Sequence, residues 1–389
     1  MKAVPIESLK PGIKFSKPIY WDRDTIFLAE RVPLTKADID KLKKFGVNEI
    51  LTNGSIVDEN PVPQDSKKQS AYATERNDDE SLRLRTLVES ISHERTNFLS
   101  IHKQSTDMIL KTYRLAAEGK VFDLQPFRTA AEEIADFTRR VYSITPFLFS
   151  YPISSYYLYT HVVNATFFAT YIGCLLEMTR PKLLELAQAS LFADIGMSFV
   201  PSVVSEKPGK LGEGEEKTMM KHTILGYQYL NQKLKVKLSL ASVALDHHEN
   251  WDGTGYPQRK KGNDIEEYTR IYSIADEFTA LIENRPHRKA ILPYDALKIL
   301  IGQDMHKFDL NIVRLVLKNM SLYPVGSFVE LDNGSRGIVL EGNDDKALRP
   351  KIRVYSDENN IKLQLLRFVD LAQETNQYIK SALPNEEIY

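Results

Sequence analysis

The chain has 389 residues, of which 42% are hydrophobic and 26% are charged, and its formal net charge is −1. This length predicts two or three domains, and the near-neutral charge gives no overall attraction to a nucleic acid polymer or to an anionic membrane. The single cysteine, Cys174, excludes an internal disulfide. Because the chain has neither an apolar leader nor a long apolar run, the cytoplasm is the expected location.

Residues 1–55 alternate short apolar runs with turns, which predicts a small α+β module. Ile19 to Leu28 is typical of a hairpin, and Thr35 is a suitable cap for a helix that ends near Phe45. Val47 to Leu51 predicts a returning strand. Residues 56–80 are polar with few apolar anchors, so they predict a flexible linker.

Residues 81–150 change to a helical pattern and predict a connector. Leu84, Leu87 and Phe98 lie on one face of a long helix, and a second helix is expected from Pro126 to Val141. The apolar faces of these helices suit core packing or a homodimer contact. Residues 151–320 predict a helical bundle, with helices at 154–178, 182–195, 213–232, 236–248, 266–283, 293–302 and 309–319.

Residues 321–372 are punctuated by glycines and predict a small β-rich appendage. Short strands are expected at Ser327–Leu331, Gly337–Leu340 and Lys351–Tyr355. Residues 373–389 are polar and are expected to form a fraying tail. The predicted fold class is therefore mainly α, with a helical bundle between a small α+β module and a small β-rich appendage.

Histidines and carboxylates gather in the predicted bundle, on different helices. A carboxylate within an apolar helical run needs a partner or a cation, and antiparallel helices can bring distant ligands into one cleft. Imidazole and carboxylate together suit iron, manganese, zinc or nickel. Taken singly, each residue also has a structural interpretation, such as a surface histidine or an ion-pair partner. The set comprises His161, Asp194, His222, His247, His248 and Asp276.

The run from His247 to Pro257, HHENWDGTGYP, resembles the signature segment of HD-GYP domains. On both sides of this run, other family motifs occur in matching order across residues 155–320. They are His161, Asp194-Ile195-Gly196, the 207–211 loop, Lys221-His222, the 270–276 run and Arg285-Pro286. The resemblance implies an HD-domain bundle in a bacterial signalling protein. Members of this family cleave the second messenger cyclic di-GMP, and some act on cyclic GMP-AMP instead.

The resemblance also implies a role for each matching residue. A binuclear iron or manganese centre would be held by His161, Asp194, His222, His247, His248 and Asp276. Asp194 would bridge the two metals and help to activate water, which makes it the expected catalytic residue. The residues expected to bind the nucleotide are Lys221, Gly255, Tyr256, Pro257 and Arg285.

The sequence departs from the family pattern at three positions. Ala193 replaces the histidine of the HD pair, and Met197 replaces a lysine that would face a phosphate. Tyr157 stands where some members have a glutamate that binds a third metal. Because alanine has no ligand atom, the site is expected to bind metal and to turn over slowly or not at all.

Three functions remain open from these residues. The first is a cyclic-dinucleotide signalling protein that binds metal and cyclic di-GMP with weak or no hydrolysis. The second is an active binuclear phosphodiesterase, and the third is a scaffold that binds a protein partner without catalysis. Metal content and turnover separate the first two, whereas mutating His247 and His248 together tests the third.

Overall fold

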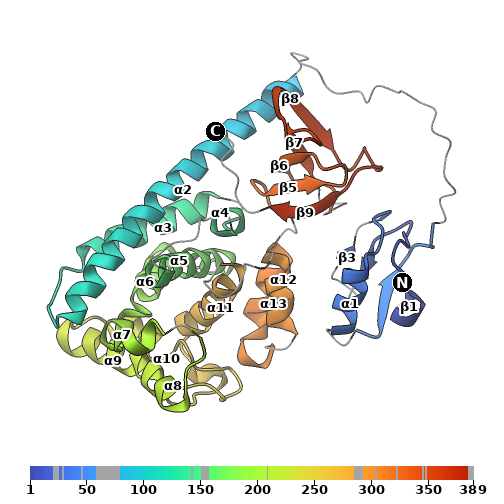
Figure 1. Cartoon of the computed structure of the whole chain (residues 1–389). Coiled ribbons are helices and arrows are strands. Elements are labelled where there is room, and N and C mark those ends of the chain that lie inside the picture. The colour runs from blue at the N-terminus through green and yellow to red at the C-terminus, as the bar shows by residue number, and fades with distance from the viewer. Residues whose placement is uncertain are drawn as a thin grey trace. The chain divides into compact units, whose positions relative to one another are not determined.

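The computed structural model describes residues 1–20, 26–28, 30–44, 47–57, 79–141, 143–149, 157–207, 209–283, 291, 293–302, 305–320, 323–343, 346 and 348–383 (Figure 1). The chain forms two compact units, one of residues 1–88 with 321–389 and the other of residues 89–320. Within the described ranges, no helix is long and apolar enough to cross a membrane. The mainly α fold class, with a small sheet module at each end of the chain, is confirmed.

The amino-terminal module is an antiparallel sheet with one helix. Its strand order is β1-β4-β2-β3, from β1 (Lys2–Pro5), β2 (Ile19–Tyr20), β3 (Ile26–Leu28) and β4 (Glu49–Thr52). Helix α1 (Lys36–Lys44) begins after Thr35, whose Oγ1 accepts a hydrogen bond from the Asp38 backbone N–H at 3.1 Å. The hairpin and the capping role of Thr35 are therefore confirmed.

The carboxy-terminal module is a five-stranded antiparallel sheet with the order β8-β7-β6-β5-β9. Its strands are β5 (Phe328–Leu331), β6 (Arg336–Glu341), β7 (Lys351–Ser356), β8 (Lys362–Asp370) and β9 (Ile379–Leu383). The prediction of a fraying tail from residue 373 is wrong over β9, which pairs with β5 through Ile379 and Leu331. The segment is polar because β9 lies at a sheet edge, where one row of neighbours is missing.

Helices build the second unit, and most lie close to the predicted ranges. They are α2 (Asp79–Ala117), which begins in the first unit, α3 (Gln125–Arg140), α4 (Thr145–Phe149), α5 (Tyr157–Leu175), α6 (Arg180–Phe192), α7 (Ser202–Ser205), α8 (Glu213–Met220), α9 (His222–Gln228), α10 (Leu238–Asp246), α11 (Glu267–Ile282), α12 (Pro293–Ile301) and α13 (Leu310–Asn319). The helix predicted over residues 213–232 is divided at Lys221 into α8 and α9. No proline marks this break, so periodicity did not reveal it.

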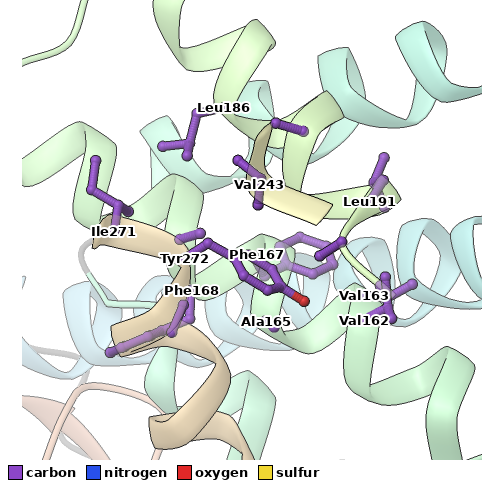
Figure 2. Close-up of a cluster of buried hydrophobic side chains, with 14 of the residues drawn as sticks. Val162, Val163, Ala165, Phe167, Phe168, Leu186, Leu191, Val243, Ile271 and Tyr272 are labelled. Carbon is purple, nitrogen blue, oxygen red and sulfur yellow. The ribbon is translucent and has the colours of Figure 1, made fainter. Parts of the chain in front are cut away.

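Helix α5 runs through the centre of this unit. Every residue from Thr160 to Gly173 is buried, because α3, α6 and α11 pack around the helix. Phe168 stacks on Phe278 of α11 with ring centroids 4.1 Å apart, within the cluster shown in Figure 2. This packing fixes the position of His161, the fifth residue of α5.

Candidate metal centre

The histidines at 222, 247 and 248 come together at the ends of two helices. His222 is the first residue of α9, and His247 and His248 follow α10 directly. One ligand atom from each lies within 4.8 Å of the other two, the one such His, Cys, Asp or Glu group found in the described part of the chain. The Nε2 atoms of His222 and His247 are 3.3 Å apart. This spacing suits imidazoles that share one cation.

Backbone carbonyls orient two of these rings. His222 Nδ1 donates to the Met219 carbonyl at 2.7 Å, and His247 Nδ1 donates to the Val243 carbonyl at 3.0 Å. Because a carbonyl only accepts, each Nδ1 carries a proton, and Nε2 is the ring atom that could bind a cation. Burial and the neighbouring His247 lower the pKa of His222, and burial lowers the pKa of His248 well below its ordinary value. Both rings are therefore neutral near pH 7, as metal ligands must be.

Asp194 lies beside this cluster. Its Oδ1 is 3.7 Å from Nε2 of His222 and 3.7 Å from Nε2 of His247, which is longer than a hydrogen bond. Gly196 permits this approach, because a Cβ at that position would lie 1.8 Å from the His222 carbonyl oxygen. The Asp-Ile-Gly turn therefore positions a carboxylate against two imidazoles.

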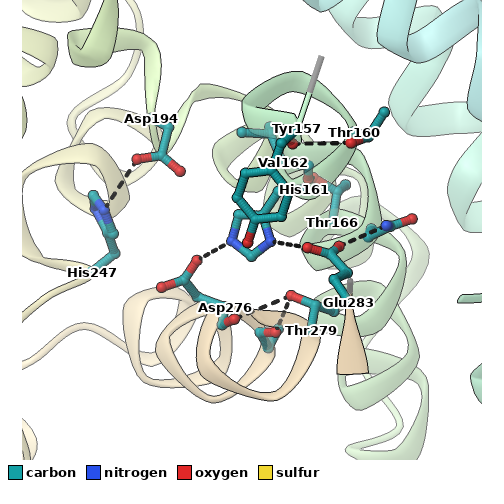
Figure 3. A network of polar contacts seen from close by, with 12 residues as sticks. Tyr157, Thr160, His161, Val162, Thr166, Asp194, His247, Asp276, Thr279 and Glu283 are labelled. Carbon is teal, nitrogen blue, oxygen red and sulfur yellow. Dashed lines mark hydrogen bonds and ion pairs between the residues drawn. The ribbon is translucent and has the colours of Figure 1, made fainter. Parts of the chain in front are cut away.

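His161 lies between two carboxylates in the arrangement drawn in Figure 3. Its Nε2 is 2.8 Å from Oδ1 of Asp276, and its Nδ1 is 2.8 Å from Oε2 of Glu283. Burial alone lowers the pKa of His161, but the charges and hydrogen bonds of Glu283 and Asp276 raise it well above its ordinary value. Against the opposing effect of burial, His161 lowers the pKa of Asp276. In the absence of a cation, a proton on His161 balances this carboxylate pair.

Tyr157 packs on His161 of this centre. Its ring stacks on His161 with centroids 5.4 Å apart and an interplanar angle of 16° (Figure 3). The charges of Asp276 and His161 act on the pKa of His248, which relates the two halves of the centre electrostatically. The structure thus brings together His222, His247, His248 and Asp194 on one side, and His161 and Asp276 on the other.

The Gly-Tyr-Pro loop braces one of the histidines. Tyr256 stacks on His248 with centroids 4.9 Å apart, and the Tyr256 N–H donates to the His248 carbonyl at 3.1 Å. A Cβ at Gly255 would lie 2.4 Å from that same carbonyl oxygen, so only glycine fits. Glu249 holds the far side of the loop by accepting from the Gln258 and Lys260 backbone N–H groups at 2.5 and 3.0 Å.

The nucleotide-binding assignments stay predictions. Lys221 is exposed and directly precedes His222, whereas Tyr256 packs against His248. Gly255 and Pro257 belong to the bracing loop. Arg285 lies outside the described residues.

Ala193 and Tyr272 occupy the space beside Asp194 in the core. Ala193 is fully buried at the end of α6, and Tyr272 of α11 is also fully buried. The Tyr272 ring meets His247 edge-on at 5.9 Å, yet its hydroxyl has no hydrogen-bond partner among the described residues. Burial, and then the charges of Asp194 and Asp276, raise the Tyr272 pKa well above its ordinary value.

Changing Tyr272 to phenylalanine is expected to raise the free energy of unfolding of the metal-free protein by about 1 kcal/mol. The reason is that a buried hydroxyl without a partner carries a desolvation cost that phenylalanine avoids. Urea unfolding in the presence of a chelator measures this change. A decrease in stability of similar size would show that the hydroxyl does have a partner in the folded protein.

Glu283 and Asn164, which the sequence analysis did not identify, hold His161 on its Nδ1 side. Glu283 follows α11, and its second oxygen accepts from Asn164 Nδ2 at 2.7 Å. Asn164 Oδ1 in turn lies 2.8 Å from Nε2 of His102 on α2. The one available signal was the spacing of Asn164 from His161, which places both on one helix face. Glu283 gave no signal, because a glutamate at a helix end is ordinary.

His102 is expected to make the metal-free protein sensitive to acid. Burial lowers the pKa of His102 to about 4, against smaller opposing effects of Asn164 and Glu283. Since the unfolded pKa is about 6.5, the unfolded chain binds the proton first, and this contribution is complete above pH 6.5 and declines towards pH 4. Between pH 7 and pH 4.5, wild type should lose about 2 kcal/mol more than His102→Gln in urea unfolding. Equal losses would contradict this, and exposed His306→Gln is the matched control.

Comparison with known proteins gives two domain families. Residues 151–312 match the family described as HD domain, and residues 328–389 match the KOW domain associated with HD domain. The second matched range, residues 328–389, contains β9, so this strand belongs to the KOW-like domain.

Curated relatives match part of the chain. A cyclic di-GMP phosphodiesterase of Pseudomonas aeruginosa is 29% identical, over 64% of this chain and 59% of its own length. The cyclic di-GMP phosphodiesterase PdeB of Borreliella burgdorferi is 27% identical, over 61% of this chain and 62% of its own length. This chain thus spans less than two thirds of either relative. A solved HDGYP protein of Bdellovibrio bacteriovorus has 16% identity and a TM-score of 0.46, covering 82% of this chain and 99% of that one.

Proposed function

Because the chain belongs to the HD-GYP family of HD-domain proteins, we propose that it is a cyclic-dinucleotide signalling protein that binds metal and cyclic di-GMP, with weak or no hydrolysis. One observation carries this proposal. The His222, His247 and His248 cluster is complete beside Asp194, whereas the adjacent position holds Ala193, which has no ligand atom.

The donors that are present fit a transition metal. Imidazoles of His222, His247 and His248 would supply nitrogen, and Asp194, whose Oδ1 lies 3.7 Å from Nε2 of His222 and of His247, would supply oxygen. This mixture suits iron or manganese. A second cation would be held by His161, Asp276 and a bridging Asp194, with one donor fewer than the family has. When bound, the metal would lower the pKa of a water molecule and polarise a phosphoryl oxygen.

In the proposed function, different residues of this chain would act on the metal and on the nucleotide. Asp194 would help to hold the metal and to activate water. Exposed Lys221 would meet a phosphate, whereas Met197 would leave a second phosphate without the lysine that the family has. Binding is therefore expected to survive better than cleavage, because cleavage also depends on the spacing and charge of both metals.

Anaerobically purified protein tests this proposal. Its iron and manganese content is measured first, and calorimetry with cyclic di-GMP and chromatography of the products follow on the same sample. We expect bound metal, saturable nucleotide binding, and little or no linear product. Rapid turnover would favour the active phosphodiesterase, whose support is the intact Asp194 and histidine cluster. Bound metal without any nucleotide binding would contradict the proposal and favour a scaffold that acts through a protein partner or a homodimer.

A further inference from the structure

A buried histidine of the connector helix, His102, is joined to His161 by a series of hydrogen bonds. His102 of α2 has no exposed surface and lies among aromatic rings, with Phe98 at 5.5 Å and a stacked Phe167 at 6.4 Å. A polar ring in such surroundings needs a partner, because burial without one is costly. At Nε2 the partner is Asn164, whose Oδ1 lies 2.8 Å away, and Thr106 Oγ1 lies 3.4 Å from Nδ1.

Each hydrogen bond between His102 and His161 has a defined donor and acceptor. Asn164 Nδ2 donates to Glu283 Oε1 at 2.7 Å, because a carboxylate only accepts. Asn164 Oδ1 therefore faces His102, and the His102 Nε2–H donates to it. The second Glu283 oxygen accepts from His161 Nδ1–H at 2.8 Å, which turns His161 Nε2 towards Asp276. An unbroken series thus runs from α2 to an expected metal ligand.

We propose that His102 is a positioning residue for His161, so that α2 is coupled to the metal centre through Asn164 and Glu283. The proposal rests on the proposed function in one respect, which is that His161 binds metal. A carboxylate that accepts from the second ring nitrogen of a ligand histidine fixes the orientation of that ring. Here the carboxylate is itself held by Asn164, and Asn164 is held by His102.

Burial makes this series sensitive to a movement of α2. Asn164 is 2% exposed and His161 is 6% exposed, so water does not readily replace a lost partner. If α2 moves His102 away, Asn164 Oδ1 loses its donor and Glu283 loses its fixed orientation. Helix α2 begins at Asp79 in one compact unit and ends at Ala117 in the other, so a change at one end has a covalent route to this contact.

The experiment compares His102→Leu with His102→Gln in the full chain. Metal affinity is measured by competition with a chelator, and the His161 Nδ1–H resonance is measured by NMR in metal-free protein. We expect His102→Leu to weaken manganese binding about 10-fold or more, as loss of outer hydrogen bonds to a ligand does, and to shift or abolish the resonance. His102→Gln should restore both, because its amide donates from a similar position. Ile109→Val on the same buried face of α2 is the control for packing.

The proposal is overturned if His102→Leu keeps manganese affinity within about twofold of wild type and leaves the His161 resonance unchanged, since twofold is well below the effect of losing such support. Should that variant not fold, Glu283→Gln decides the matter, because an unchanged His161 resonance there breaks the series at its centre. Wild-type protein that binds no metal would refute the proposed function, whereas the resonance in metal-free protein would still test the coupling.

Discussion

Replacing His247 with leucine is expected to lower the affinity for iron or manganese by more than about 100-fold, because loss of a direct ligand exceeds the effect of losing an outer partner. His247 contributes the Nε2 that lies 3.3 Å from His222 Nε2 and 3.7 Å from Asp194. Leucine fills much of the same buried space but has no donor atom. Metal content after anaerobic purification and chelator competition both measure the loss.

Thermal unfolding provides an independent measure of the same change. Metal at 100 times its dissociation constant adds about 2.7 kcal/mol to the stability of wild type by mass action, and this gain should disappear in His247→Leu. His306→Gln is the matched control, because this histidine is exposed and lies 3.7 Å from Asp252, away from the cluster. Retention of full metal content in His247→Leu would exclude the cluster as the metal site.

The paired substitution Ala193→His with Met197→Lys is expected to raise hydrolysis of cyclic di-GMP at least about 10-fold over wild type, because a positioned ligand or cation typically contributes that much or more to catalysis. Ala193 directly precedes Asp194, so an imidazole there would restore the missing donor. Met197 is half-buried, one short helical turn beyond Asp194, and lysine there would supply the missing cation. Formation of linear product at saturating manganese measures the gain.

Ala193 is fully buried, so its replacement by histidine also adds volume to a packed region. Such overpacking typically costs about 1–3 kcal/mol, and the stability of the variant has to be measured beside its activity. Ala193→Leu with Met197→Lys is the control, since it adds volume and charge without an imidazole. A folded, metal-loaded His and Lys variant that is no faster than this control would show that another defect limits the reaction.

Several residues of the candidate metal centre could be predicted from the sequence because they belong to short-range motifs. The His247-His248 pair and the Asp194-Ile195-Gly196 turn each carry their own context, and the structure brings them together with His222. The partners behind them could not be found in this way. Glu283 reaches His161 across 122 positions, and the contact depends on how α5 and α11 pack.

Secondary structure could likewise be predicted from the sequence only where it depends on local pattern. Long helices with a strong apolar period, such as α3 and α11, were predicted within a few residues of their ends. Strand β9 was missed because an edge strand pairs on one side and has a weak apolar pattern. The division at Lys221 was missed because no proline or glycine marks it; there the 195–199 turn packs closely against α9, with Gly196 beside the His222 carbonyl.

The enclosure of α5 gives the two sides of the metal centre unequal freedom to adapt. His161 is carried by a helix that the bundle surrounds, so it cannot shift without loosening the bundle. His247 and His248 instead follow the end of α10 and lead into the loop that Glu249 and Tyr256 brace. If the proposed function holds, attempts to alter nucleotide preference should therefore be directed at the loop side, with the α5 side kept as a rigid reference.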